Sequence, residues 1–168
     1  SDVCSSDLHT LSVAGVRTAD AVAVTEAYLD RIARFNGELN AFTMVDAEGA
    51  RAAAAQSARR IAAGDARALE GVPIGIKANI DIEGFATTAG VEARRDAVAT
   101  ADAPVITRLR DAGAVILGHL NMHEAAMGAT SDNAAFGRVS NPHNLGHTPG
   151  GSSGGSGSAV AAGLCLAA

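Results

Sequence analysis

The sequence is poor in aromatic residues and in cysteine. It has no tryptophan, one tyrosine and four phenylalanines among 168 residues, and its two cysteines, Cys4 and Cys165, stand near opposite ends. Two distant cysteines exclude a disulfide scaffold, so we expect a reducing compartment and a cytoplasmic location. No apolar run is long enough to span a membrane, and the first ten residues lack the basic and apolar regions of a signal peptide.

A positively charged surface is also missing. The formal net charge is −5 at pH 7, which argues against nucleic-acid binding as the main function. Hydrophobic residues make up 48% of the chain, a proportion typical of globular and not of disordered proteins. The length suits one modest domain, but residues 1–10 show no hydrophobic periodicity, and we expect them to be non-native or disordered.

A glycine- and serine-rich stretch, residues 148–162, is the most informative part of the chain. It reads TPGGSSGGSGSAVAA, so that glycine pairs flank Ser152 and Ser153 on both sides. Glycine is used where the backbone takes positive φ or approaches another group closely. The small residues that follow are compatible with a helix, so the stretch predicts a tight loop that leads into a helix N-terminus.

Three interpretations of this loop compete. A flexible linker disagrees with Pro149 before the run and with the apolar residues directly after it. A phosphate-binding loop of the Walker A type needs a lysine after its last glycine, and this stretch has none. The third interpretation is a loop that carries catalytic serine side chains.

Residues 71–82 (GVPIGIKANIDI) alternate between apolar and polar positions and predict a β-strand. Ile74, Ile76 and Ile80 share one face of such a strand, and Lys77 lies on the other. We expect the isoleucine face to be buried in a mixed sheet. For an isolated strand, a solvated lysine at a sheet edge is the simpler interpretation.

The rest of the chain alternates helices with a second strand. Helical spacing runs from an N-cap at Thr18 to Asn36-Gly37, and again over residues 46–63. Residues 103–112 predict a third helix, and residues 114–118 (AVILG) predict a buried strand. This order predicts an α/β fold whose mixed β-sheet is covered by helices.

His119 and His123 raise the question of a metal site. They stand four residues apart, and Glu124 follows the second histidine. The spacing differs from the HExxH pattern of zinc enzymes, and no third ligand stands at a useful spacing. We therefore expect no metal site.

Three segments together resemble the amidase signature family. PGGSSGGSGSAVAAG (149–163) is similar to the core of the signature, and GVPIGIKANIDIEGFATTAG (71–90) is similar to the segment with the catalytic lysine. Residues 117–144 (LGHLNMHEAAMGATSDNAAFGRVSNPHN) resemble a segment that lines the acyl pocket. Lys77 and Ser152 stand 75 positions apart, the spacing that the family has. The resemblance covers about residues 18–168.

The resemblance implies the N-terminal part of the amidase-signature fold and a Ser-Ser-Lys mechanism that needs no cofactor. In that mechanism Lys77 is the general base, Ser152 is a bridging serine held by a cis peptide bond, and Ser153 supports the loop. The resemblance also makes Met127 and Gly128 candidates for the wall of the acyl pocket, and the alternative for Met127 is an ordinary core methionine.

A lysine can act as a base only when it is neutral, so this assignment requires burial that lowers its pKa from about 10.4. Many family members have aspartate directly after the lysine, whereas this chain has Ala78. Because residue 78 points away from Lys77 in an extended strand, we expect a change in packing and an intact base.

The family's nucleophilic serine lies further beyond the bridging serine than the 16 residues that follow Ser152 here. We therefore expect residues 11–168 to be a partial amidase-signature domain that ends before the nucleophile. Such a fragment should be inactive by itself and poorly stable.

The resemblance implies two alternative functions. The first is an amidase that hydrolyses a small-molecule carboxylic amide to an acid and ammonia. The second is the glutamine-hydrolysing A subunit of the glutamyl-tRNA(Gln)/aspartyl-tRNA(Asn) amidotransferase, which works with partner subunits on charged tRNA. That subunit usually has an acidic residue where His123 stands, which favours the amidase. A third hypothesis is a non-catalytic α/β module that binds an anion at the helix N-terminus after the loop.

Overall fold

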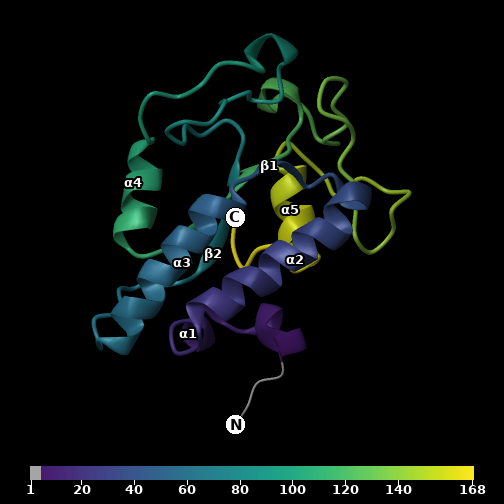
Figure 1. Cartoon of the computed structure of the whole chain (residues 1–168). Helices are drawn as coiled ribbons and strands as arrows, with labels where there is room; N and C mark the ends of the chain where they lie inside the picture. The colour runs from purple at the N-terminus through teal and green to yellow at the C-terminus, as the bar shows by residue number, and fades with distance from the viewer. Residues whose placement is uncertain (1–4) are drawn as a thin grey trace.

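Three short strands form a mixed sheet at the centre of residues 5–168, the part of the chain that the computed structural model describes (Figure 1). The strands are β1 (Phe42–Val45), β2 (Pro73–Lys77) and β3 (Val115–Leu120), in the spatial order β1-β3-β2. β3 pairs antiparallel with β1 and parallel with β2. All six residues of β3 are buried, which explains why this central strand is so apolar.

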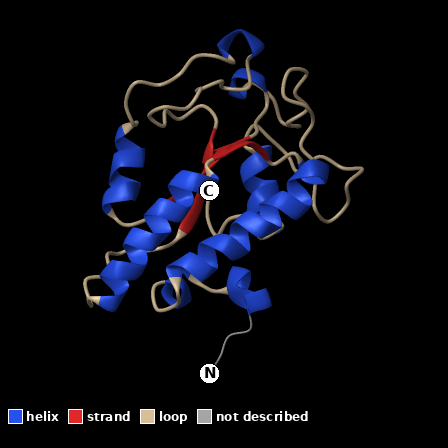
Figure 2. Ribbon diagram, in the orientation of Figure 1, coloured by secondary structure: helices blue, strands red, loops and turns tan. Residues whose placement is uncertain are grey.

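Helices surround the sheet (Figure 2). They are α1 (Val13–Val16), α2 (Ala21–Leu39), α3 (Ala47–Ala62), α4 (Pro104–Asp111) and α5 (Gly154–Ala161), with short 3₁₀ helices η1 (Ser5–Thr10), η2 (Glu92–Arg94) and η3 (Glu124–Ala126). α3 packs on β3 and α2 packs on α3, whereas α5 contacts β2 and β3. The predicted fold class, α/β with a mixed sheet covered by helices, is confirmed.

The strand predicted over residues 71–82 is shorter than expected. β2 ends at Lys77, where the chain turns because the Ile80 N–H donates to the Lys77 carbonyl oxygen over 3.0 Å. The two isoleucines within the strand are buried, as predicted, while Ile80 is half-buried. The alternation of apolar and polar residues in the sequence therefore continues beyond Lys77, the last residue of β2 that pairs with β3.

Helix α2 begins and ends later than the sequence predicts. Its N-cap is Asp20 and not Thr18, because the Asp20 carboxylate accepts two N–H groups of the first turn. The helix continues through Asn36, whose side-chain amide both donates to and accepts from the Phe42 backbone. Asn36 therefore fastens the start of β1, and Asn40, with φ of 49°, ends the helix.

The other two predicted helices are confirmed. α3 is capped by the Asp46 side chain and is followed by Gly64 in the left-handed conformation, with φ of 73°. α4 has Pro104 in its first turn and stops before Gly113, with φ of 97°. Both endings follow from glycine's freedom to take positive φ.

Residues 5–10 fold against α2. Leu8 of η1 is buried, and the Tyr28 hydroxyl donates to the His9 carbonyl oxygen over 3.1 Å. Disorder was expected for residues 1–10; of these, residues 1–4, including Cys4, lie outside the described part. The remaining cysteine, Cys165, is free and buried. Every helix within residues 5–168 is too short or too polar to cross a bilayer.

A buried carboxylate, that of Glu70, links α3, the segment before β2 and the end of α4. Glu70 is fully buried and accepts from the Ser57 hydroxyl in α3 and from the Arg67 guanidinium, both over 2.6 Å. Arg67 in turn donates to the Arg110 carbonyl oxygen at the end of α4 over 3.1 Å. The hydrogen bonds from Arg67, and then from Ser57, lower the pKa of Glu70 from 4.5 to about 2 against the opposing effect of burial.

We predict that Glu70→Gln lowers the free energy of unfolding by about 2 kcal/mol at neutral pH, because an amide does not replace the charge-assisted hydrogen bonds from Arg67. The folded-state pKa is depressed, so this contribution is present above pH 4.5 and disappears as the pH falls towards about 2. Urea unfolding at several pH values in that range measures both effects.

Glu26→Gln is the matched control for this prediction. It removes a carboxylate whose partner, Arg51, has a side chain that is 51% exposed. Because exposed ion pairs contribute little, we expect a much smaller change in stability. If both variants lost the same free energy of unfolding, the burial of Glu70 would add nothing to the stabilisation by its ion pair.

Candidate active site

The glycine- and serine-rich stretch forms a tight loop that leads into α5, as its sequence predicts (Figure 1). The peptide bond between Gly151 and Ser152 is cis. Ser153 is the N-cap residue of α5, but its side chain does not bond to the helix backbone. Both serine hydroxyls are therefore available to groups outside the helix.

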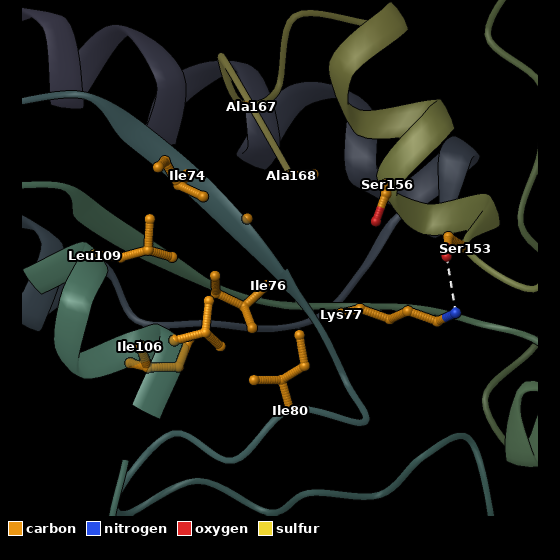
Figure 3. Close-up of a pocket in the computed structure, with 12 residues that line it drawn as sticks. Ile74, Ile76, Lys77, Ile80, Ile106, Leu109, Ser153, Ser156, Ala167 and Ala168 are labelled. Carbon is orange, nitrogen blue, oxygen red and sulfur yellow. Dashed lines mark hydrogen bonds between the residues drawn. The ribbon is translucent and has the colours of Figure 1, made fainter. Parts of the chain in front are cut away.

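The side chain of Lys77 extends from the end of β2 to this loop (Figure 3). Its amine lies 2.8 Å from the Ser152 hydroxyl and 2.8 Å from the Ser153 hydroxyl. The predicted meeting of Lys77 and Ser152 is thus present, and Ser153 joins them. Lys77 is the only lysine in the sequence.

The surroundings of Lys77 favour its neutral form. Burial lowers the pKa of the amine below the ordinary value of 10.5. Both partners are hydroxyl groups, and within residues 5–168 no carboxylate forms an ion pair with the amine. An amine with a depressed pKa and no anionic partner is suited to accept a proton.

The glycines beside the two serines allow close backbone contacts. Gly150 has a positive φ of 92°, while Gly151, Gly154 and Gly155 do not. A Cβ at Gly155 would lie 2.3 Å from the Asn121 carbonyl oxygen, and one at Gly151 would lie 2.7 Å from the Gly128 carbonyl oxygen. Positions 151, 154 and 155 therefore require glycine because a side chain would not fit, and not because the backbone needs positive φ.

A cavity of about 500 Å³ opens next to Lys77 (Figure 3). Ser153 and Ser156 lie at one end of it. The rest of the lining is mainly apolar and comes from β2, the turn after it, α4 and the last two residues: Ile74, Gly75, Ile76, Ile80, Val105, Ile106, Leu109, Ala167 and Ala168. Sequence reasoning missed the α4 residues, although their spacing of three and four positions marks one helix face.

Neither of the two residues assigned to the pocket wall, Met127 and Gly128, lines this cavity. The side chain of Met127 is 85% exposed and lies outside the cavity. Gly128 packs against the ring of His123, where a Cβ would lie 2.2 Å from Nε2, and it also touches the loop at Gly151. Gly128 is therefore a neighbour of the candidate site, and the role of Met127 and Gly128 in an acyl pocket stays a prediction.

The two histidines have separate surroundings. His119 is buried, and its Nε2 lies 3.0 Å from the Ile80 carbonyl oxygen, while burial lowers the pKa of the ring. His123 Nδ1 lies 3.4 Å from the Thr130 hydroxyl. Within residues 5–168, no three histidine, cysteine, aspartate or glutamate side chains are grouped so that they could hold a metal ion.

Comparison with known proteins gives a family match over most of the chain. The sequence profile of the family described as Amidase matches residues 23–168. The A subunit of the glutamyl-tRNA(Gln) amidotransferase from Roseiflexus sp. (strain RS-1) is 45% identical over 162 residues, which cover 93% of this chain and 33% of that protein. The chain spans about a third of the length of such curated relatives.

Two solved structures have a similar fold. One is described as a vestigial protein complex that reveals the evolutionary origins of an s-triazine catabolic enzyme; it is 43% identical, with a TM-score of 0.88 over 91% of this chain and 34% of that chain. The other is a bacterial aryl acylamidase, 30% identical, with a TM-score of 0.88 over 95% of this chain and 35% of that chain.

The close contact at Gly155 gives a stability prediction. Gly155→Ala should lower the free energy of unfolding by about 2–3 kcal/mol, because the new methyl group would meet backbone atoms of Asn121 and Ala41 that cannot rotate away. Chemical denaturation of the variant measures the loss.

Gly157→Ala is the control in the same helix. The nearest atom to a Cβ at that position is 3.8 Å away, so the substitution meets no obstacle. Alanine has the higher helix propensity, and we expect unchanged stability or a gain of up to about 1 kcal/mol. If Gly155→Ala proved as stable as Gly157→Ala, the close approach of α5 to the strands would not constrain the fold.

Proposed function

The chain belongs to the amidase signature family, and on that basis we propose that it supplies the general base and the bridging serine of an amide-hydrolysing enzyme. The observation that carries the proposal is the Lys77 amine, 2.8 Å from the Ser152 hydroxyl in a site where burial favours the neutral amine. The cis peptide bond before Ser152 agrees with the bridging role that the family resemblance implies.

The hydroxyl of Ser153 orients the base in this proposal. A neutral amine has two N–H bonds and one lone pair. When one N–H donates to the Ser153 hydroxyl, 2.8 Å away, the lone pair can face the proton of the Ser152 hydroxyl. Ser153 then sets the direction of proton transfer without taking part in it.

The proton moves in two steps. Ser152 gives its hydroxyl proton to Lys77 and accepts the proton of the nucleophilic serine, whose oxygen attacks the carbonyl carbon of the amide. The proton returns by the same path to the leaving nitrogen, so ammonia departs and an acyl-serine remains. Water then attacks the acyl-serine, releases the acid and restores the serine.

We place the nucleophilic serine outside residues 1–168, as the family resemblance implies. The serines of α5 are poor candidates. Ser158 is buried, and its hydroxyl donates to the Ser140 carbonyl oxygen over 2.8 Å. Ser156 lines the cavity, but the two hydrogen bonds of the Lys77 amine within residues 5–168 go to Ser152 and Ser153. The activity is therefore proposed for the protein at the length of its relatives.

Replacement of Lys77 tests the proposal. Lys77→Ala should lower kcat by about 10³-fold or more in the protein at the length of its relatives, because no other group takes the Ser152 proton. Lys77→Arg should be equally inactive, since a guanidinium does not lose its proton near neutral pH. In the unmodified protein, kcat/KM should rise with pH through a pKa below 10.5, because the active form of the base is neutral.

Thermal unfolding is the control for these variants. Lys77→Ala removes little buried apolar area, so the unfolding temperature should change little. A variant that folds normally and keeps most of its kcat would remove Lys77 from the mechanism.

The second candidate function is that of one component of an amidotransferase complex. It is favoured by the 45% identity to the A subunit of a glutamyl-tRNA(Gln) amidotransferase, whereas the residue type at His123 favours a separate amidase. Ammonia release from simple amides by the protein alone would support the amidase. Glutamine hydrolysis that appears only with partner subunits and glutamyl-tRNA(Gln) would support the amidotransferase.

A further inference from the structure

The catalytic loop rests on a second segment, residues 128–133, which the proposed mechanism does not use. A Cβ at Gly151 would lie 2.7 Å from the Gly128 carbonyl oxygen, so the two segments touch backbone to backbone. The Thr148 hydroxyl also donates to the Thr130 carbonyl oxygen. The segment therefore supports the loop directly.

Ser131 is the residue of this segment whose side chain spans the loop. It is fully buried; its hydroxyl accepts from the Gly154 N–H over 3.0 Å and donates to the Ser152 carbonyl oxygen over 3.4 Å. These two partners stand on either side of Ser153. One hydroxyl thus connects both ends of the turn that carries the two serines facing Lys77.

The Ser131 hydroxyl packs tightly against the start of α5. A Cβ at Gly154 would lie 2.3 Å from the Ser131 hydroxyl oxygen, so glycine at 154 is what lets this hydroxyl reach the loop. Ser131 itself has φ of 53°, in the left-handed region that a residue with a Cβ rarely adopts. The Val139 N–H donates to its carbonyl oxygen over 3.1 Å and helps to hold it there. A residue held in this conformation beside a reactive loop points to a functional role.

We propose that Ser131 is a positioning residue for Ser152. Its hydroxyl holds the Ser152 carbonyl and the Gly154 N–H in place. Because the backbone of Ser152 is held, the Ser152 hydroxyl keeps one direction relative to the Lys77 amine. The His123 N–H also donates to the Ser152 carbonyl oxygen over 3.0 Å, but within residues 5–168 it is the Ser131 hydroxyl that links that carbonyl to the first residue of α5. The inference rests on the proposed function, because a positioning effect on rate requires that Ser152 relay the proton.

Steady-state amide hydrolysis by Ser131→Ala and Ser131→Gly tests the inference, in the protein at the length of its relatives. We expect kcat to fall about 10- to 100-fold in both variants and KM to stay within about twofold, because a displaced Ser152 slows proton transfer and leaves substrate contacts unchanged. Glycine adopts positive φ without strain, so a loss in Ser131→Gly cannot be assigned to a distorted backbone.

Ser158→Ala is the matched control. Ser158 is another fully buried serine, and its hydroxyl donates to a single carbonyl oxygen, that of Ser140, over 2.8 Å. We expect a lower unfolding temperature with kcat within about twofold of the unmodified protein.

Two results would overturn the positioning role: an unchanged kcat in Ser131→Gly, or equal losses of kcat in Ser131→Ala and Ser158→Ala. Lys77→Ala separates this inference from the proposed function. If Lys77→Ala is inactive while Ser131→Gly is fully active, only the positioning role fails. If Lys77→Ala keeps its activity, the proposed function fails as well.

Discussion

The close approach of α5 to the strands is the constraint on which the candidate site depends. The Gly155 N–H donates to the Asn121 carbonyl oxygen over 3.0 Å, and the Asn121 N–H donates to the Ala41 carbonyl oxygen over 2.8 Å. Three segments distant in sequence therefore meet backbone to backbone, which only a residue without a side chain permits at position 155. Because α5 begins directly after Ser153, this contact also sets the distance from both serine hydroxyls to the end of β2.

Two ionisable groups, the buried Glu70 and the half-buried Lys77, have different functions: one stabilises the fold and the other is suited to proton transfer. Glu70 is surrounded by donors from Arg67 and Ser57, which stabilise its charge and join α3, the segment before β2 and the end of α4. Lys77 is bonded to hydroxyl groups, and within the described residues it has no anionic partner. The pKa of each group is lowered, but for opposite physical reasons: hydrogen bonding favours the carboxylate, whereas burial disfavours the ammonium. The first arrangement resists a change of charge, and the second makes a proton easier to exchange.

Local sequence signals predicted the elements better than their ends. Alternation indicated a strand around Lys77 and helical spacing indicated α2, but β2 ends before the alternation does and α2 continues past Asn36. Asn36 fastens the backbone of Phe42 instead of ending the helix. The turn after Lys77 is held by Ile80, whose carbonyl oxygen lies 3.0 Å from His119 Nε2 on another strand. The contact between Ile80 and His119 joins residues 39 positions apart, so it has no signature within a short window of sequence.

The sequence by itself determined the α/β class and the loop before a helix, because periodicity and residue type reflect local geometry. The pairing of Lys77 with Ser152 followed from long motifs that resemble those of the amidase signature family. Only the tertiary structure decided that Ser153 shares the lysine, that Met127 is exposed and that Ser131 spans the loop. These facts depend on which side chains meet across distant segments. That packing lowers the pKa of Lys77 by partly burying its amine, and it brings other backbone and side-chain atoms close to Gly154 and Gly155. Residue identities alone do not specify either effect.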